Sequence, residues 1–172
     1  IKQKSNSFED LLFINAILPY RVKQKISQSS LFIQPSTDCV FHGDSKGHYE
    51  VDALRNATDF YGISKIYGEL SMLQFSNTLI LRGSIIGVSP SQGRGLLDWF
   101  LSQENNSEIN GYLNHSWNGI STLEWCKLLE SLLTTGNYKN TNLIQFGLPL
   151  SVSKFELLQL FNDVFKKNIK IH

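Results

Sequence analysis

Apolar side chains recur along parts of the chain at three- and four-residue steps, which is the spacing of one helix face. Residues 7–28 follow this pattern behind Ser7, a suitable N-cap, and they predict a helix that Pro19 kinks. Residues 58–74 predict a second helix in the same way. The expected apolar face of this second helix consists of Phe60, Ile63, Tyr67, Leu70 and Leu73.

Three further helices are predicted closer to the end of the chain. A short one is expected over residues 96–103. The other two begin at capping boxes, in which a serine and a glutamate three residues later satisfy each other's backbone N–H groups. These pairs are Ser121 with Glu124 and Ser153 with Glu156.

Continuous apolar runs predict strands within residues 30–41, 77–87 and 142–150. Strands that are apolar on both faces are typical of a parallel sheet covered on both sides. Pro35 is unusual in such a strand because it has no N–H to donate to the ladder. Residues 108–119 predict a short strand and a turn. Because helices and strands alternate, the expected fold class is α/β with a parallel sheet.

Composition and charge narrow the classes of function. The 172 residues are 41% hydrophobic and 18% charged, as in globular proteins with a sizeable core. The net charge of +1 gives no long-range field, and the apolar stretches are too short to span a bilayer, so neither nucleic acid nor a membrane is an expected partner. Cys39 and Cys126 lack metal-binding spacing, which predicts free thiols in the cytoplasm and no metal site.

Tyr61 and Lys65 stand four residues apart in the predicted second helix. By itself this spacing is weak evidence, because about 0.4 such pairs are expected by chance in a chain of this composition. A core tyrosine beside a solvated lysine is the simpler explanation of the bare pair. In a helix, however, the two side chains share a face. The ammonium would then lower the pKa of the phenol and make it a better acid–base group near neutrality.

Thr37 gives this pair a chemical context. It follows an apolar strand, and ligands of open α/β sheets bind beyond the carboxyl ends of the strands. A hydroxyl at that position polarises a substrate carbonyl while the tyrosine delivers a proton. The three residues therefore predict a carbonyl-reduction site that needs only a hydride donor.

Several short motifs around these residues occur in one order. They are "STDCVFHG", Tyr49–Glu50, "YGISKIYGE", "LILRGSIIG" and "GYLNHSWNGIS". Together they resemble the extended short-chain dehydrogenase/reductases, in particular the dTDP-4-dehydrorhamnose reductase-like branch of polysaccharide biosynthesis. The separation of Thr37 and Tyr61 matches that branch, and the resemblance runs from "INAILP" to "SKFELLQLF".

The resemblance implies a reaction and a role for each residue. Tyr61 would protonate the C4 oxygen of a 4-keto-deoxy sugar nucleotide, and Thr37 would hydrogen-bond the same carbonyl. Lys65 would lower the pKa of Tyr61 and hold the ribose hydroxyls of NAD or NADP. The fold it implies is the later part of a Rossmann-type sheet over residues 1–90. Residues 91–172 would be mostly a smaller substrate-binding lobe, with some return to the sheet.

Two sets of binding residues follow from the same resemblance. Cofactor contacts would come from Ser36, Tyr61, Lys65, Arg82 and Ser84. Substrate contacts would come from Thr37, Asp38, Ile85, Asn114 and Trp117. The residues alone leave plainer roles open: Arg82 as a structural residue at a strand end, Asp38 as an orienting residue, and Asn114–Trp117 as a tight turn.

The sequence departs from the family pattern in two places. The Gly-rich turn G-x-x-G-x-x-G, which binds the cofactor pyrophosphate at a helix N-terminus, is absent. We therefore expect the first strands of the Rossmann domain to lie upstream of Ile1, and this chain alone to bind NAD(P)H poorly and be inactive. At the position of Ile85 the rhamnose-forming enzymes usually carry an aromatic residue. This difference favours another keto-deoxy sugar nucleotide, such as one linked to UDP, as substrate.

Two other functions fit the same fold. A sugar-nucleotide epimerase would use the same tyrosine and lysine, but "GYLNHSWNG" matches the reductase branch more closely. A non-catalytic binding protein is the second, since the regulatory β subunit of methionine adenosyltransferase is a relative of these reductases and fold does not fix function. The presence of Thr37, Tyr61 and Lys65 together favours an enzyme. A homodimer is compatible with each of these functions.

Overall fold

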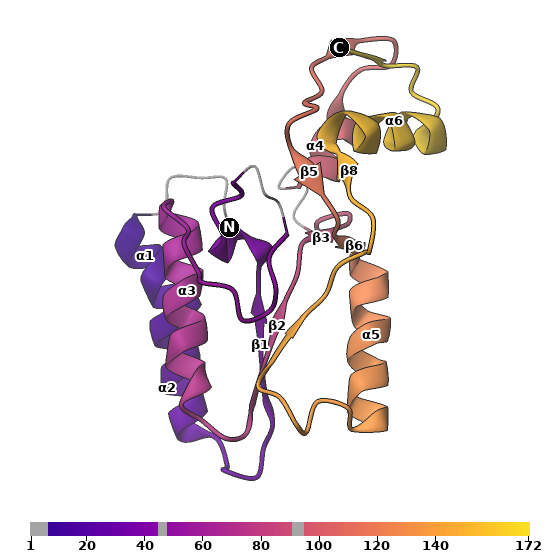
Figure 1. Ribbon diagram of the computed structural model, residues 1–172. Coiled ribbons are helices and arrows are strands. Elements are labelled where there is room, and N and C mark those ends of the chain that lie inside the picture. Colours follow the sequence, from indigo (N-terminus) through magenta and orange to yellow (C-terminus); the bar gives the residue numbers. More distant parts are fainter. Residues whose placement is uncertain (1–6, 45–47, 91–94) are drawn as a thin grey trace. The chain divides into compact units, whose positions relative to one another are not determined.

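A computed structural model describes residues 7–44, 48–90 and 95–172 of the chain. The chain forms two compact units, shown with their elements in Figure 1. Unit 1 comprises residues 1–83 and 128–146, and unit 2 comprises residues 84–127 and 147–172. The fold is mixed α/β, as predicted, and no helix among the described residues is long and apolar enough to cross a membrane.

The first helical segment of unit 1 has three parts. Helix α1 (Phe8–Leu12) is followed by the π-helical segment η1 (Phe13–Ile17) and by helix α2 (Leu18–Lys25). The predicted N-cap is confirmed, because the backbone N–H of Asp10 donates to the Ser7 hydroxyl at 3.2 Å. Pro19 lies in the first turn of α2, directly after η1. A proline lacks the N–H of a regular α-helical bond, and the chain changes its helical geometry in the residues just before it.

The sheet of unit 1 has three parallel strands in the order β1-β2-β7 (Figure 1). These are β1 (Phe32–Ser36), β2 (Thr78–Arg82) and β7 (Leu143–Gln145). Strand β2 is buried along its whole length, as its two apolar faces predicted. Pro35 lies on β1, which pairs only with β2 among the described strands, so its missing N–H disturbs no second ladder there.

The carboxyl ends of the three strands coincide. In the register of the sheet, Ser36 pairs with Arg82, and Arg82 pairs with Gln145. After β1, Thr37 caps a short 3₁₀ helix, η2 (Asp38–Val40). The alignment places one polar side chain from each strand at the same edge of the sheet.

Helix α3 (Phe60–Leu73) begins at Asp59, whose carboxylate accepts the N–H of Gly62 at 3.0 Å. It packs against α1, η1 and α2, and also against β1 and β2 (Figure 1). The predicted apolar face is wrong in part, because Phe60, Tyr67 and Leu70 are 50% exposed or more. The buried residues of α3 are Gly62, Ser64, Gly68, Glu69 and Met72.

Small residues explain which face of α3 is buried. A side chain at position 68 would collide with the carbonyl oxygen of Asn15 in η1. The Asn15 side chain in turn donates to the hydroxyl of Ser64 at 2.9 Å. Glycine and serine therefore let two helices approach closely, a contact that a search for large apolar residues overlooks.

The described residues of unit 2 form three pairs of short strands, two complete helices and the start of α5 (Thr122–Thr135). The strand pairs are β3 (Ile85–Ile86) with β6 (Ile120–Ser121), β4 (Glu108–Ile109) with β9 (Lys170–Ile171), and β5 (Ser116–Trp117) with β8 (Val152–Ser153). The helices are α4 (Leu96–Ser102) and α6 (Lys154–Phe165). Their apolar faces meet in a core formed by Phe100, Ile109, Leu157, Leu158, Phe161 and Ile169.

Both capping predictions correspond to helix starts. Helix α6 has the complete capping box of Ser153 and Glu156. Helix α5 (Thr122–Thr135) follows Ser121, whose hydroxyl accepts the N–H of Glu124 at 3.1 Å. Helix α5 begins in unit 2 and ends in unit 1.

Candidate active site

Thr37 lies directly beyond the carboxyl end of β1 and is buried. Its hydroxyl donates to the carboxylate of Asp38 at 3.1 Å and accepts the backbone N–H of Cys39 at 3.2 Å. These two contacts fix the rotamer of the threonine. Asp38 thus orients Thr37, in agreement with the plainer of its two expected roles.

Tyr61 and Lys65 lie one turn apart near the start of α3, as the spacing predicted. The Lys65 ammonium is 6.0 Å from the centre of the Tyr61 ring and donates to the carbonyl of Pro35 at 3.1 Å. This bond ties α3 to the end of β1, two residues before Thr37. The structure therefore brings Thr37, Tyr61 and Lys65 together at one edge of the unit 1 sheet.

The electrostatics of Tyr61 differ from the expectation that Lys65 lowers its pKa. Burial, joined by the charges of Cys39, Asp38 and Asp59, raises the pKa of Tyr61 to about 12, although a hydrogen bond with Thr37 acts in the opposite direction. Burial also lowers the pKa of the Lys65 ammonium, against the attraction of Glu69. Tyr61 is consequently a neutral phenol at physiological pH, which is the form that donates a proton.

Below these residues lies a buried charge network centred on Glu69. Arg82 binds its carboxylate with two hydrogen bonds, from Nε at 3.1 Å and from Nη2 at 2.7 Å. Arg55 Nε and the hydroxyl of Ser36 donate to the two carboxylate oxygens, each at 2.5 Å. The side chains of Glu69 and Arg82 have no exposed surface.

This network gives Ser36 and Arg82, both expected at the cofactor, contacts inside the protein. Glu69 was not identified from the sequence, although it stands four residues after Lys65 and so lies on the same side of α3. That spacing is the signal that could have revealed it. Burial raises the pKa of Glu69, but the hydrogen bonds from Arg82, Ser36 and Arg55 and the charge of Arg82 outweigh burial and lower it.

Arg82 also fixes the loop between η2 and α3. Its Nη1 donates to the carbonyl of Val51 at 3.1 Å and to the side-chain oxygen of Gln145 at 2.9 Å. Gln145 donates in turn to the carbonyl of Tyr49 at 2.9 Å. The Tyr49 ring stacks on Phe41, with ring centres 4.3 Å apart. The ends of β2 and β7 thereby hold residues 49–51 of this loop.

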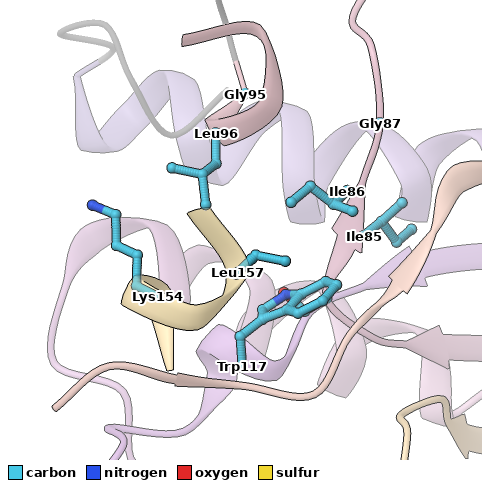
Figure 2. Close-up of a pocket in the computed structure, with 9 residues that line it drawn as sticks. Ile85, Ile86, Gly87, Gly95, Leu96, Trp117, Lys154 and Leu157 are labelled. Carbon is cyan, nitrogen blue, oxygen red and sulfur yellow. The ribbon is translucent and has the colours of Figure 1, made fainter. Parts of the chain in front are cut away.

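The remaining candidates lie in unit 2, and most of them line a cavity of about 270 Å³ (Figure 2). Ser84, Ile85 and Trp117 all line it, and the indole N–H of Trp117 donates to the Ser84 hydroxyl at 2.8 Å. Ser84 is thus a neighbour of the expected substrate residues. Lys154 lines the same cavity and was not identified from the sequence, since nothing in its sequence position sets it apart from a solvated lysine.

Asn114 is exposed and is not among the residues that line the cavity. Its side-chain oxygen lies 3.0 Å from Nδ1 of His115, the next residue. A contact between neighbouring residues is compatible with a tight turn, which was the alternative to substrate binding that the sequence left open for Asn114–Trp117.

Comparisons with known proteins agree with this architecture. The family model for the RmlD substrate binding domain matches residues 11–109. No curated protein sequence matches significantly. Among solved structures, a dTDP-4-dehydrorhamnose reductase from Bacillus anthracis in complex with NADP superposes with a TM-score of 0.82 at 18% identity, over 99% of this chain and 61% of that one.

Two further structures extend the likeness. A dTDP-4-dehydrorhamnose reductase from Clostridium acetobutylicum gives a TM-score of 0.80 at 17% identity, over 96% of this chain and 58% of that one. A UDP-N-acetylglucosamine 4-epimerase from Bacillus cereus gives 0.77 at 14% identity, over 100% and 63%. The chain spans about three fifths of the length of these proteins. The likeness shows that the fold is of the Rossmann type.

Proposed function

The chain belongs to the RmlD substrate binding domain family, and on that premise we propose that it carries the proton donor of an NAD(P)H-dependent reductase for a 4-keto-deoxy sugar nucleotide. The observation that supports this most directly is the cluster of Thr37, Tyr61 and Lys65 at the carboxyl end of β1. Ligands of open α/β sheets bind at this edge. The similarity to two dTDP-4-dehydrorhamnose reductases supports the proposed substrate class.

The proposed chemistry divides between the side chains. Thr37 turns its single hydroxyl proton from Asp38 to the substrate carbonyl oxygen and draws electron density from the carbonyl carbon. Tyr61 transfers its phenolic proton to that oxygen, so that the carbonyl becomes an alcohol. The raised pKa of Tyr61 keeps this proton in place until charge develops on the oxygen. Bound NADH or NADPH supplies the hydride.

The described residues fit one end of such a cofactor. In this proposal Lys65 and Tyr61 hold its ribose, and the bond from Lys65 to Pro35 at the end of β1 supports it by tying α3 to the sheet edge. The sequence contains no Gly-rich pyrophosphate turn. We therefore propose that these 172 residues alone bind the cofactor weakly and do not turn over substrate.

The test is an assay of the complete gene product that contains this chain. The absorbance of NADPH or NADH is followed with dTDP- and UDP-linked 4-keto-6-deoxy sugars as substrates. Oxidation of the cofactor that Tyr61→Phe abolishes supports the proposal. An undiminished rate in Tyr61→Phe, or no oxidation with any of these sugars, contradicts it.

A titration of NADPH and NADH by fluorescence tests the cofactor contact separately. Lys65→Met should weaken binding, because the ammonium no longer reaches the ribose. Lys25→Met is the matched control, since Lys25 is an exposed lysine at the end of α2. Equal weakening by both substitutions would show that only overall charge matters.

An epimerase is the second candidate, favoured by the similarity to the UDP-N-acetylglucosamine 4-epimerase. A reductase consumes one reduced cofactor for each product molecule, whereas an epimerase returns its hydride to the same sugar. Product formation without net loss of NADPH or NADH would therefore select the epimerase.

A further inference from the structure

Three successive residues at and just beyond the end of β1 are each hydrogen-bonded to α3. Their partners stand four residues apart in the helix, a spacing that places them on one face. The pairs are Pro35 with Lys65, Ser36 with Glu69, and Thr37 with Tyr61. Two of these pairs contain residues of the proposed chemistry. The pair of Ser36 and Glu69 contains none of them, and its contribution is the question here.

The hydrogen bond between Ser36 and Glu69 lies inside the protein. The Ser36 hydroxyl donates to Oε1 of Glu69 at 2.5 Å, and the two residues are 8% and 1% exposed. Side chains of a helix point toward its N-terminus, which directs the Glu69 carboxylate toward the end of α3 that carries the catalytic tyrosine. Because both partners are buried, bulk water does not replace this bond when the hydroxyl is removed.

Ser36 is not required to neutralise Glu69. The carboxylate already accepts two bonds from the guanidinium of Arg82 and one from that of Arg55. A serine hydroxyl is a neutral donor and adds no charge to this arrangement. What it adds is a connection, because it joins the residue directly before Thr37 to the helix that carries Tyr61.

Arg82 fixes the carboxylate relative to the sheet. Ser36 and Arg82 are partners in the parallel β1–β2 ladder, and both donate to Oε1 of Glu69. Arg82 also donates to the side-chain oxygen of Gln145, at the end of β7, at 2.9 Å. Glu69 is thus anchored to the ends of the strands, and the position of α3 along β1 is fixed through it.

The proposed proton transfer is sensitive to that position. Thr37 and Tyr61 come from different elements, and both hydroxyls must reach the same substrate oxygen. A displacement of about 1 Å between reacting groups can lower a rate by a factor of about 10². A bond that sets the register of the strand end and the helix therefore acts on the rate without touching the substrate.

We propose that Ser36 and Glu69 are positioning residues, whose hydrogen bond holds α3 in the register on β1 in which Thr37 and Tyr61 meet one oxygen atom. The inference rests on the proposed function, in which these two hydroxyls act on a substrate carbonyl. The Glu69 side chain has no exposed surface, so it acts through its neighbours.

Ser36→Ala in the complete gene product tests the inference by kinetics. We expect kcat to fall at least about tenfold, with KM within about twofold of the wild-type value, since the lost interaction matters in the transition state. The ratio of kcat in H₂O to kcat in D₂O should rise, because proton transfer becomes slower relative to the other steps. This ratio does not depend on the folded fraction, so a loss of stability alone leaves it unchanged.

Ser71→Ala is the matched control, because the Ser71 hydroxyl donates to the carbonyl of Gly68 within α3 at 2.9 Å. It should keep the wild-type kcat and isotope ratio. Ser36→Cys is similar in size to the wild type but has only a weak S–H donor. It should show the same changes as Ser36→Ala and replaces that variant if the alanine protein does not fold.

Hydrogen exchange of the Cys39 amide, followed by NMR, reports on the same register without turnover. This N–H donates to the Thr37 hydroxyl at 3.2 Å, so a displaced Thr37 exposes it. The Cys39 amide should exchange faster in Ser36→Ala than in the wild type. In Ser71→Ala its exchange rate should be that of the wild type.

A lower kcat with an unchanged isotope ratio in Ser36→Ala would mean a purely structural role and would overturn the inference. Equal changes in Ser36→Ala and Ser71→Ala would do the same. Faster exchange at Cys39 in a protein that reduces no keto sugar would contradict the proposed function alone. Reduction by the wild type, with kcat, isotope ratio and Cys39 exchange all unchanged in Ser36→Ala, would contradict this inference alone.

Discussion

Glu69 and Arg82 form a bidentate ion pair, with 2.7 Å between Nη2 of Arg82 and Oε2 of Glu69. Both side chains are completely buried. The pair joins the middle of α3 to the carboxyl end of β2. Ser36, at the end of β1, donates to the same carboxylate. One buried charge thus links the helix that carries Tyr61 and Lys65 to the strand that precedes Thr37.

Removal of this charge should strongly destabilise unit 1. Glu69→Ala leaves Arg82 buried without a counter-charge, and breaking a buried pair in this way costs about 3–5 kcal/mol. Urea unfolding followed by circular dichroism measures the loss. Glu124→Ala removes an exposed carboxylate that pairs with Lys127, and it should change stability by less than about 1 kcal/mol. Equal losses for the two variants would contradict the role given to the network.

The same carboxylate should make stability depend on pH. The folded pKa of Glu69 is lowered, so its stabilisation is fully present above the unfolded value of about 4.3. That stabilisation is lost as the pH falls through the lowered folded value, because the unfolded state then binds more protons. The unfolding free energy of the wild type should decline in this acid range. The pH profile of Glu69→Gln should be flatter there, and an unchanged profile would show that other carboxylates dominate.

Activity should not depend on titration of Tyr61 near neutral pH. Because the pKa of Tyr61 is raised to about 12, the phenol remains protonated, and the rate should fall through its ionisation only in strongly alkaline solution. In the complete gene product, Tyr61→Phe should lower kcat by a factor of about 10²–10⁴ at pH 7. Tyr67→Phe changes an exposed tyrosine of the same helix and should leave kcat unchanged. An alkaline limb near pH 7 that is absent from Tyr61→Phe would contradict this assignment.

A glycine-to-alanine change in α3 should have the opposite of its usual effect. Alanine is favoured over glycine in helix interiors by about 1 kcal/mol. At Gly68, however, the new methyl group would collide with the carbonyl of Asn15. Gly68→Ala should therefore destabilise the protein by about 1–3 kcal/mol, the usual cost of overpacking. Chemical denaturation measures this, with Leu70→Ala, at a half-exposed position, as the control. A stabilised Gly68→Ala would show that α3 and η1 separate easily.

Lys23 offers a test of a buried cation with no carboxylate partner among the described residues. It is 1% exposed, and its ammonium donates to the carbonyls of Ser30 and Asn77 at 3.3 and 3.0 Å. Lys23→Met should cost about 1.5–3 kcal/mol, the range for hydrogen bonds to a charged group. Lys25→Met, at an exposed position, should be close to neutral in the same thermal unfolding measurement. A neutral Lys23→Met would mean that the methionine packs well enough to replace both bonds.

Secondary structure and family could be predicted from the sequence, because helix caps, apolar strands and family motifs are each encoded in a few adjacent residues. The Ser7 cap, the Ser153 capping box and the apolar β2 are each encoded in a few adjacent residues, and all three are found. The family resemblance is confirmed by the match over residues 11–109. The proximity of Thr37 and Tyr61 followed from their place at a strand end and a helix start.

Contacts between distant segments could not be predicted in this way. The buried face of α3 is chosen by glycines that fit against Asn15 and by the charge of Glu69, whereas periodicity favours Phe60 and Tyr67. The pKa of Tyr61 depends on burial, which a spacing of four residues to Lys65 does not reveal. Lys154 contacts the Tyr112 ring and lines the cavity of unit 2 together with residues that are far away in the sequence, so its sequence position does not reveal these neighbours.

The loop between η2 and α3 is attached to the sheet through its main chain. Arg82 and Gln145 bind the carbonyl oxygens of Val51 and Tyr49, atoms that every residue type possesses. A substitution at Val51, whose side chain is 40% exposed, leaves the attachment intact. A deletion or insertion between Tyr49 and Val51 would change the spacing of the two carbonyls that Gln145 and Arg82 bind. This part of the loop therefore tolerates changes of amino-acid type at such exposed positions and resists changes of length.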